Sequence, residues 1–263
     1  MHEEEFFVST VLNRFVFNPI AQALGFHTHG NHTVPPHIAI ALLVSLLLIA
    51  FAFFLRSRLS WENPGNLQQG FELLYEALTS FMRDMIGPGA EKYFPLIGSL
   101  FLYIWINNMI GMVPGFMSPT SNINVTAGMG IIVFICYNAE GFREHGFVKY
   151  MAHFAGPSLL IAPLLFVIEI ISHMARPFSL SVRLFGNIFA EELIIGTLNR
   201  LFPFVVSLPV MALGLFAGTI QAFIFVVLTM VYLGGSVQHT HDEEVHRAVP
   251  EDTVESSGFH VPK

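Results

Sequence analysis

Apolar residues dominate the chain in long runs, and these runs predict helices that cross a membrane. The first run covers about 37–55 and ends at Arg56 and Arg58. Two further runs cover about 95–113 and 123–139, and a final apolar mass covers about 159–200 and 203–234. A helix of about 20 residues crosses a hydrocarbon core of about 30 Å. The pattern therefore predicts five crossings, and Pro203 separates the last two.

The last two apolar runs are unusually long for membrane helices. At about 1.5 Å per residue, the first of them spans about 60 Å, which is about twice the thickness of the hydrocarbon core. Such a helix must tilt strongly or bend, and Pro163 and Pro177 are the expected bending points. We therefore expect a strongly tilted helix hairpin that can follow a curved partner.

The segment from Gly65 to Ile86 has a different pattern, because its apolar residues recur at helical spacing and its polar residues take the other side. This spacing predicts an amphipathic helix on the cytoplasmic membrane surface rather than a crossing. The apolar positions are Leu67, Phe71, Leu74, Leu78, Phe81 and Met85.

Composition agrees with an all-α polytopic membrane protein. Hydrophobic residues make up 53% of the 263 residues and charged residues only 12%, against about a quarter charged in soluble proteins. The net charge of −7 comes mostly from the two ends and gives no sign of nucleic-acid binding. Positive residues gather on one side of the five predicted crossings, which places the N-terminus outside and the C-terminus in the cytoplasm. On the inside lie Arg56, Arg58, Arg83, Lys92, Arg143, Lys149, Arg247 and Lys263, against Arg14 and Arg200 outside.

The chain forms one predicted membrane domain over 1–263. It divides into an external segment (1–36), the first crossing and surface helix (37–94), two further crossings (95–158), the hairpin (159–235) and a polar tail (236–263). The acidic start is unlike a signal peptide, so we expect no removable leader. Cys136 is the only cysteine, which excludes an internal disulfide and a thiolate metal site. The histidines of the N-terminal loop and of the tail are a weak signal for metal, and we expect no metal or cofactor.

Arg183 lies deep in the first long run, where a charged side chain costs about 2.5 kcal/mol or more. It should therefore face a partner charge or a water-filled cavity. Two interpretations stay open: a buried structural network, or an ion path that uses a permanently protonated arginine as an electrostatic barrier. On a helical wheel, Arg183 shares one polar stripe with Glu169, Ser172, His173, Arg176, Ser179 and Asn187.

Four segments between about 95 and 235 carry specific motifs. They read Asn-Met-Ile-Gly-Met-Val-Pro-Gly-Phe at 108–116, Pro-Thr-Ser-Asn-Ile-Asn-Val-Thr at 119–126, Ser-Leu-Ser-Val-Arg-Leu-Phe-Gly-Asn at 179–187 and Gln-Ala-Phe-Ile-Phe-Val-Val-Leu-Thr-Met-Val-Tyr-Leu at 221–233. Together they resemble subunit a of the membrane sector of F-type ATP synthases. The first ninety residues agree with that family in the order of their predicted helices more than in their amino-acid sequence.

The resemblance implies a function and a set of partners. Arg183 would face the rotating ring of c subunits, and ions would cross through two half-channels that each reach partway through the membrane. Asn187, Glu192 and Gln221 would line the channel open to the outside, and Glu169 the channel open to the cytoplasm. His173 is a further candidate half-channel residue, assigned to neither channel. Glu192 lies about 180° around the helix from Arg183 and so points into the stator. The implied partners are the c-ring, the b subunits of the peripheral stalk and the lipid of a bacterial inner membrane.

The chain departs from the family pattern at two positions. Many bacterial members have a glycine just before the glutamate that matches Glu192, and a histidine seven residues before the glutamine that matches Gln221; here these positions hold Glu191 and Gly214. The resemblance therefore implies that Glu191 takes over the proton-relay work of the histidine and that Gly214 makes room for it. The alternative is that Glu191 faces the outer interface and Gly214 is a packing glycine.

Other function classes are a secondary ion transporter, a membrane subunit of a respiratory complex and an inert anchor for partners. A transporter usually has internal repeats, which this chain lacks. In a haem-binding subunit, His153 and His173 could supply ligands, and a Soret band from the purified chain would identify it. The buried charges of Arg183 and Glu169 argue against an inert anchor.

Overall fold

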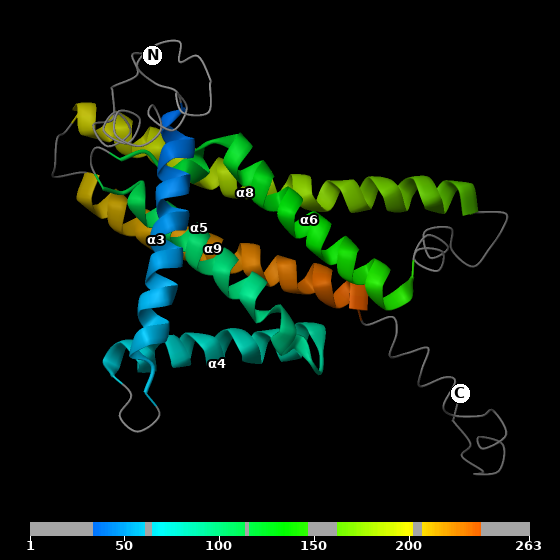
Figure 1. Cartoon of the computed structure of the whole chain (residues 1–263). Helices are drawn as coiled ribbons and strands as arrows, with labels where there is room; N and C mark the ends of the chain where they lie inside the picture. The colour runs from blue at the N-terminus through cyan, green and yellow to red at the C-terminus, as the bar shows by residue number, and fades with distance from the viewer. Residues whose placement is uncertain (1–33, 61–64, 114–115, 147–161, 202–206, 238–263) are drawn as a thin grey trace, which may run out of the picture.

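The computed structural model describes residues 34–60, 65–113, 116–146, 162–201 and 207–237, and these residues form an all-helical fold (Figure 1). The predicted helical class is confirmed. The α-helices are α3 (Pro36–Arg58), α4 (Asn66–Ile86), α5 (Phe94–Ile110), α6 (Ile123–His145), α8 (Ala162–Leu201) and α9 (Ser207–Val237), with short 3₁₀ helices η2 (Ala90–Tyr93) and η3 (Pro119–Ser121).

Four of the described helical segments are long and apolar enough to cross a membrane, which agrees with a polytopic membrane protein. They are Pro36–Arg58, Ala90–Ile110, Ile123–Arg143 and Leu208–Val237. The 40-residue α8 is not among them. It carries six charged residues between Glu169 and Arg200, so the fifth crossing stays a prediction.

Helix α3 starts at a proline and is apolar on all sides. Pro36 occupies the first turn, where the missing N–H costs nothing. Only a short patch near its start is buried, at Ala39, Ile40, Ala41 and Val44. The rest of the helix exposes large apolar side chains such as those of Leu46, Leu47 and Phe53, as expected for a surface covered by lipid.

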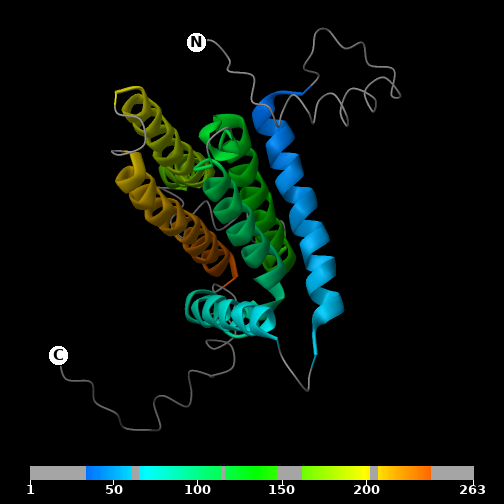
Figure 2. The same cartoon turned by 90° about the vertical axis from the view of Figure 1, so that its left-hand side faces the viewer.

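Helix α4 confirms the predicted amphipathic helix and lies across the end of α3 (Figures 1 and 2). It ends at Gly87, whose φ of 100° favours glycine. Its buried side runs through Leu78, Met82 and Ile86, while Leu67 stays exposed. The predicted apolar stripe is therefore only partly used for packing within this chain.

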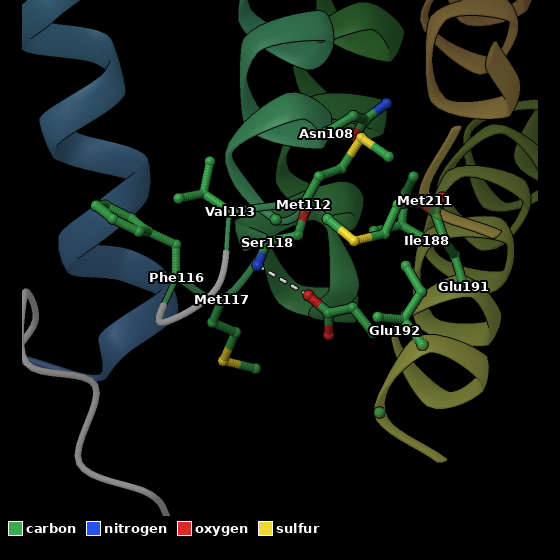
Figure 3. A pocket seen from close by; sticks show the side chains of 13 residues that line it. Asn108, Met112, Val113, Phe116, Met117, Ser118, Ile188, Glu191, Glu192 and Met211 are labelled. Carbon is green, nitrogen blue, oxygen red and sulfur yellow. Dashed lines mark hydrogen bonds between the residues drawn. The ribbon is translucent and has the colours of Figure 1, made fainter. Parts of the chain in front are cut away.

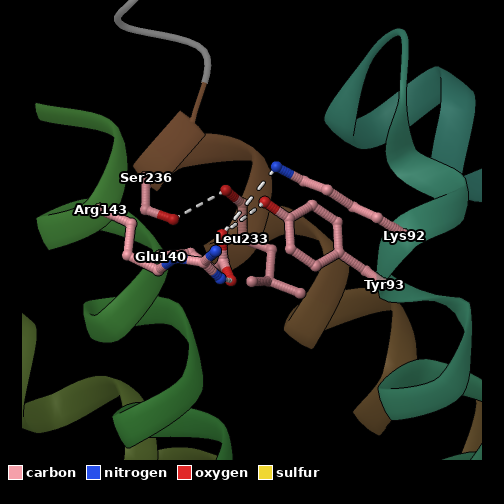
Figure 4. A network of polar contacts seen from close by, with 6 residues as sticks. All are labelled: Lys92, Tyr93, Glu140, Arg143, Leu233 and Ser236. Carbon is pink, nitrogen blue, oxygen red and sulfur yellow. Dashed lines mark hydrogen bonds and ion pairs between the residues drawn. The ribbon is translucent and has the colours of Figure 1, made fainter.

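The 3₁₀ helix η2, just before α5, and the C-terminal part of α6 are joined by a polar network around Glu140 (Figure 4). The Tyr93 hydroxyl donates to Glu140 Oε2 over 3.3 Å, and Arg143 Nη1 lies 3.0 Å from Oε1. Lys92 Nζ lies 3.9 Å from Oε2. Both cations are at least half exposed, so each ion pair contributes at most about 1 kcal/mol.

Glycines allow close packing of α6 against α8 and of α9 against α4. A Cβ added to Gly130 on α6 would meet Ser181 Oγ and lie 2.9 Å from the Pro177 carbonyl oxygen on α8. A Cβ on Gly234 of α9 would meet the Met85 carbonyl oxygen on α4. Small residues let membrane helices approach in this way. The shared core includes Val133, Tyr137, Leu180, Leu184, Ile188, Phe225, Val226 and Met230.

Helices α8 and α9 lie side by side and run across the direction of α3 (Figure 1). Figure 2 shows α5 and α6 between α3 and this pair. Helix α8 is continuous through Pro177. The predicted break at Pro203, the amphipathic piece at 6–17, the N-terminal histidine loop, His153 and the tail from 238 lie outside the described residues.

Candidate functional site

Arg183 lies on the exposed side of α8, and Leu180, Leu184 and Ile188 form the buried side of the same helix. It makes no hydrogen bond or ion pair with any residue that the structure describes. A charge at this depth of an apolar segment needs a partner or water. The cation of Arg183 is therefore available to a group other than the described residues of this chain.

One turn after Arg183, Asn187 contacts α9. Its Nδ2 donates to Gln221 Oε1 over 2.7 Å. Gln221 is 2% exposed, and its Nε2 has no hydrogen-bond partner in the described part of the chain. A buried N–H without an acceptor costs about 1–3 kcal/mol. This donor is a natural place for water, so the contact joins α8 to α9 while keeping one polar group available.

A pocket of about 270 Å³ opens where α8 faces the end of α5 and the segment before η3 (Figure 3). Glu192 lies at its wall, and its Oε1 accepts a hydrogen bond from the Ser118 backbone N–H over 2.8 Å. Glu192 thus points away from the side of α8 that carries Arg183. The lining also includes Asn108, Gly111, Met112, Val113, Phe116, Met117, Ile188, Glu191, Ile195, Gly196 and Met211.

Behind the pocket, buried polar side chains connect η3 to α5 and α9. The Ser118 and Thr120 hydroxyls lie 2.7 Å apart, and Thr120 Oγ1 donates to Asn108 Oδ1 over 2.7 Å. Asn108 Nδ2 then donates to the Gly218 carbonyl over 3.0 Å. Sequence reasoning assigned these residues no role. The signal was present, because Asn108 interrupts an otherwise apolar run.

Glu191, which lines this pocket, lies against Gly214 of α9. A Cβ added to Gly214 would collide with Glu191 Oε1 and lie 3.2 Å from Glu191 Cγ. Any larger residue at 214 therefore has to displace the Glu191 carboxylate. Glycine is what allows this side chain to lie between α8 and α9.

A second polar group lies on α8 on the other side of Arg183. Glu169 precedes Arg183 by 14 residues, about 21 Å along a helix, and its Oε1 lies 4.0 Å from Arg176 Nη2. The Arg176 guanidinium lies 5.6 Å from the centre of the Tyr232 ring on α9. Arg183 therefore separates an acidic pocket from a mixed-charge group along α8.

The predicted polar stripe does not form one continuous surface. His173 is 8% exposed and packs on α6, where its Nε2 lies 2.8 Å from Asn138 Oδ1, while Arg183, Ser179 and Asn187 are exposed. The reason is that the stripe follows the border between the buried and exposed sides of α8. His173 Nε2 is thus engaged by an amide, which argues against haem ligation through that nitrogen. Among the described residues, no group of three or more His, Cys, Asp or Glu could hold a metal ion.

Comparison with known proteins identifies one family. A family model described as ATP synthase A chain matches residues 38–234. The ATP synthase subunit a of Syntrophobacter fumaroxidans is 41% identical over 233 residues, which cover 85% of this chain and 97% of the relative. The ATP synthase subunit a 1 of Syntrophotalea carbinolica is 41% identical over 205 residues (78% and 87%). The ATP synthase subunit a of Campylobacter jejuni is 43% identical over 202 residues (76% and 88%).

Proposed function

The chain belongs to the ATP synthase A chain family, and we propose that it is the stator subunit that carries protons to and from a rotating c-ring through two offset half-channels. The observation that carries this proposal is the state of Arg183. It is an exposed cation within an apolar segment and has no partner among the described residues. A carboxylate on each c subunit, brought past α8 by rotation, supplies the missing counter-charge.

The first half-channel is the Glu192 pocket together with the Asn187–Gln221 contact. The pocket combines two carboxylates with the buried Ser118 hydroxyl and the buried Asn108 amide. The buried Gln221 Nε2 donor has no partner among the described residues. Water and carboxylates are the groups that proton paths use within membranes. Glu192 would take protons from the outside, and the Asn187–Gln221 contact would mark the route toward Arg183.

The second half-channel is the group around Glu169, His173 and Arg176. It lies on the part of α8 before Arg183, whereas the pocket lies on the part after it. This separation along α8 supports two paths that do not meet directly. A proton can pass from one half-channel to the other only while bound to a carboxylate of the rotating c-ring.

Arg183 makes this transfer obligatory for electrostatic reasons. A nearby cation favours the ionised form of a carboxylate, so a ring carboxylate gives up its proton as it approaches Arg183. The fixed positive charge also repels a proton that would pass directly between the two half-channels. Each elementary charge that crosses 100 mV releases about 2.3 kcal/mol, and the ring converts this energy into rotation.

The distribution of Lys and Arg along the chain supports a location in the cell membrane. The bias of Lys and Arg toward one side supports an N-terminus outside and a C-terminus in the cytoplasm of a bacterial cell. Helix α4 then lies at the cytoplasmic surface. The c-ring, the b subunits of the peripheral stalk and the surrounding lipid complete the assembly.

Cross-linking tests which surface of the chain meets the ring. Ser179 is exposed on α8, one turn before Arg183, and Ile131 is exposed on α6. In a Cys136→Ser background, Ser179→Cys labelled with a benzophenone maleimide should capture a c subunit on illumination of whole-complex membranes. Ile131→Cys is the matched control and should not. Capture of c from Ile131 alone would place the ring on α6 and contradict the proposal.

A further inference from the structure

His173 and Asn138 form a buried contact between α8 and α6 that the proposed half-channels do not by themselves explain. His173 Nε2 lies 2.8 Å from Asn138 Oδ1 and 3.3 Å from the Tyr137 hydroxyl. The histidine ring also packs edge-on against Phe134, with centroids 5.4 Å apart. Three side chains from about one turn of α6 are therefore arranged around one imidazole of α8.

The orientation of the Asn138 amide is fixed by its own helix. Asn138 Nδ2 donates to the Phe134 carbonyl oxygen over 2.7 Å. A carbonyl oxygen can only accept, so the amide nitrogen must face Phe134 and the amide oxygen must face His173. That oxygen can only accept as well, which requires His173 Nε2 to carry a hydrogen. The neutral ring is therefore held as the Nε2–H tautomer, and Nδ1 is the atom at which a proton is gained or lost.

Charged groups of both signs face this ring. Glu169 precedes His173 by one turn of α8 and Arg176 follows it by about one turn. Among the described residues, α6 brings the Tyr137 phenol to this ring, and the Tyr232 ring of α9 lies 6.0 Å from that of Tyr137. Burial of the ring and the nearby Arg176 cation oppose a charged imidazole, whereas Glu169 favours one. The neutral ring is therefore the favoured state, and Glu169 supports its transient protonation.

From this geometry we propose that His173 carries protons in the cytoplasmic half-channel by gaining and losing one at Nδ1, and that Asn138 is the positioning residue that holds its tautomer. The inference rests on the proposed function above. A proton released from a carboxylate of the c-ring reaches His173 Nδ1 through water and gives an imidazolium. The imidazolium then loses that same proton from Nδ1 to the Glu169 carboxylate or to water, and Nε2 keeps its hydrogen throughout.

The test is passive proton flux through the membrane sector in inverted vesicles stripped of the catalytic sector. The medium then contacts the cytoplasmic side, and its pH is varied from about 5.5 to about 8.5, the range in which an imidazole titrates. We expect the wild-type flux per assembled complex to show a transition that His173→Gln removes. Glutamine retains an N–H for Asn138, so the helix contact is preserved in this variant.

Asn138→Asp distinguishes proton carriage from a purely structural contact. A carboxylate that accepts from Nε2–H favours the imidazolium, so the midpoint of the transition should move to higher pH by about one unit. Asn66→Asp introduces the same charge at an exposed position of α4 and should leave the midpoint unchanged. The combination of His173→Gln with Asn138→Asp should show no transition.

Two results would overturn this inference. One is a wild-type flux and pH profile per complex in His173→Gln. The other is an Asn138→Asp midpoint that equals the wild-type value, which would make the pair a structural contact only. The proposed function fails separately, through ATP-driven pumping by an Arg183→Ala complex, and that result does not depend on position 173 or 138.

Discussion

Exchange of the side chains at 191 and 214 tests whether these two positions act as a unit. A Cβ at Gly214 already collides with Glu191 Oε1 and lies 3.2 Å from Cγ, so an imidazole there overfills the contact between α8 and α9. Overpacking of this kind costs about 1–3 kcal/mol. If this free-energy cost falls on the conformation that conducts protons, Gly214→His lowers proton flux about 5- to 150-fold.

Glu191→Gly removes the colliding side chain and with it the proposed relay carboxylate. Alone, this change should lower passive proton flux, because the pocket loses an ionisable group and gains a void. Combined with Gly214→His, it removes the overlap and returns an ionisable side chain from the other helix. We expect the double variant to recover flux to within about tenfold of the wild type, a remaining cost of about 1.4 kcal/mol.

The assay is passive proton flux per assembled complex in vesicles stripped of the catalytic sector. Gly128 is a matched control site, since a Cβ there meets nothing within 4 Å. Gly128→His should therefore change flux little, and it should not be improved by Glu191→Gly. A double variant of 191 and 214 that is no better than its worse single parent would refute the coupling.

Two further predictions concern the pocket and the helix contacts. Glu192→Gln keeps the acceptor for the Ser118 N–H but removes the charge. Proton flux per complex should therefore fall without vanishing, because water reroutes protons through neighbouring polar groups. An unchanged rate per complex would mean that the carboxylate is structural only. Gly130→Ala places a Cβ 2.9 Å from the Pro177 carbonyl and should lower the free energy of unfolding by about 1–3 kcal/mol, measured by thermal inactivation of the complex. Gly128→Ala is its control and should be neutral, and equal inactivation of the two variants would contradict the packing argument.

Hydrophobic runs predicted the helices well because membrane helices must be long and apolar. The predicted boundaries lie within a few residues of the structure for α4 and α5, at 66–86 and 94–110. Periodicity within one helix does not say which neighbour covers it. The stripe that contains His173 and Arg183 therefore divides into a buried and an exposed part only when α6 is in place.

The sequence predicts candidate site residues that lie in recognisable motifs. It does not predict residues whose part in the site depends on contacts between helices. Arg183 and Glu192 are predicted site residues because of their charge in an apolar run and because of the family resemblance. The roles of Ser118 and Asn138 depend on a backbone N–H and on an amide orientation. Such features arise from packing between helices distant in the sequence, which no local pattern records.

The most direct test of the central claim is ATP-driven proton pumping by membranes with Arg183→Ala, normalised to assembled complex. Arg200 is exposed on the same helix, so Arg200→Ala is the matched control and should pump close to the wild-type rate. Arg183→Ala should hydrolyse ATP without building a proton gradient. Arg183→Lys should fail or nearly fail, because a lysine within an apolar membrane segment can lose its proton and lacks the guanidinium fork. A gradient of wild-type size in Arg183→Ala membranes would contradict the account.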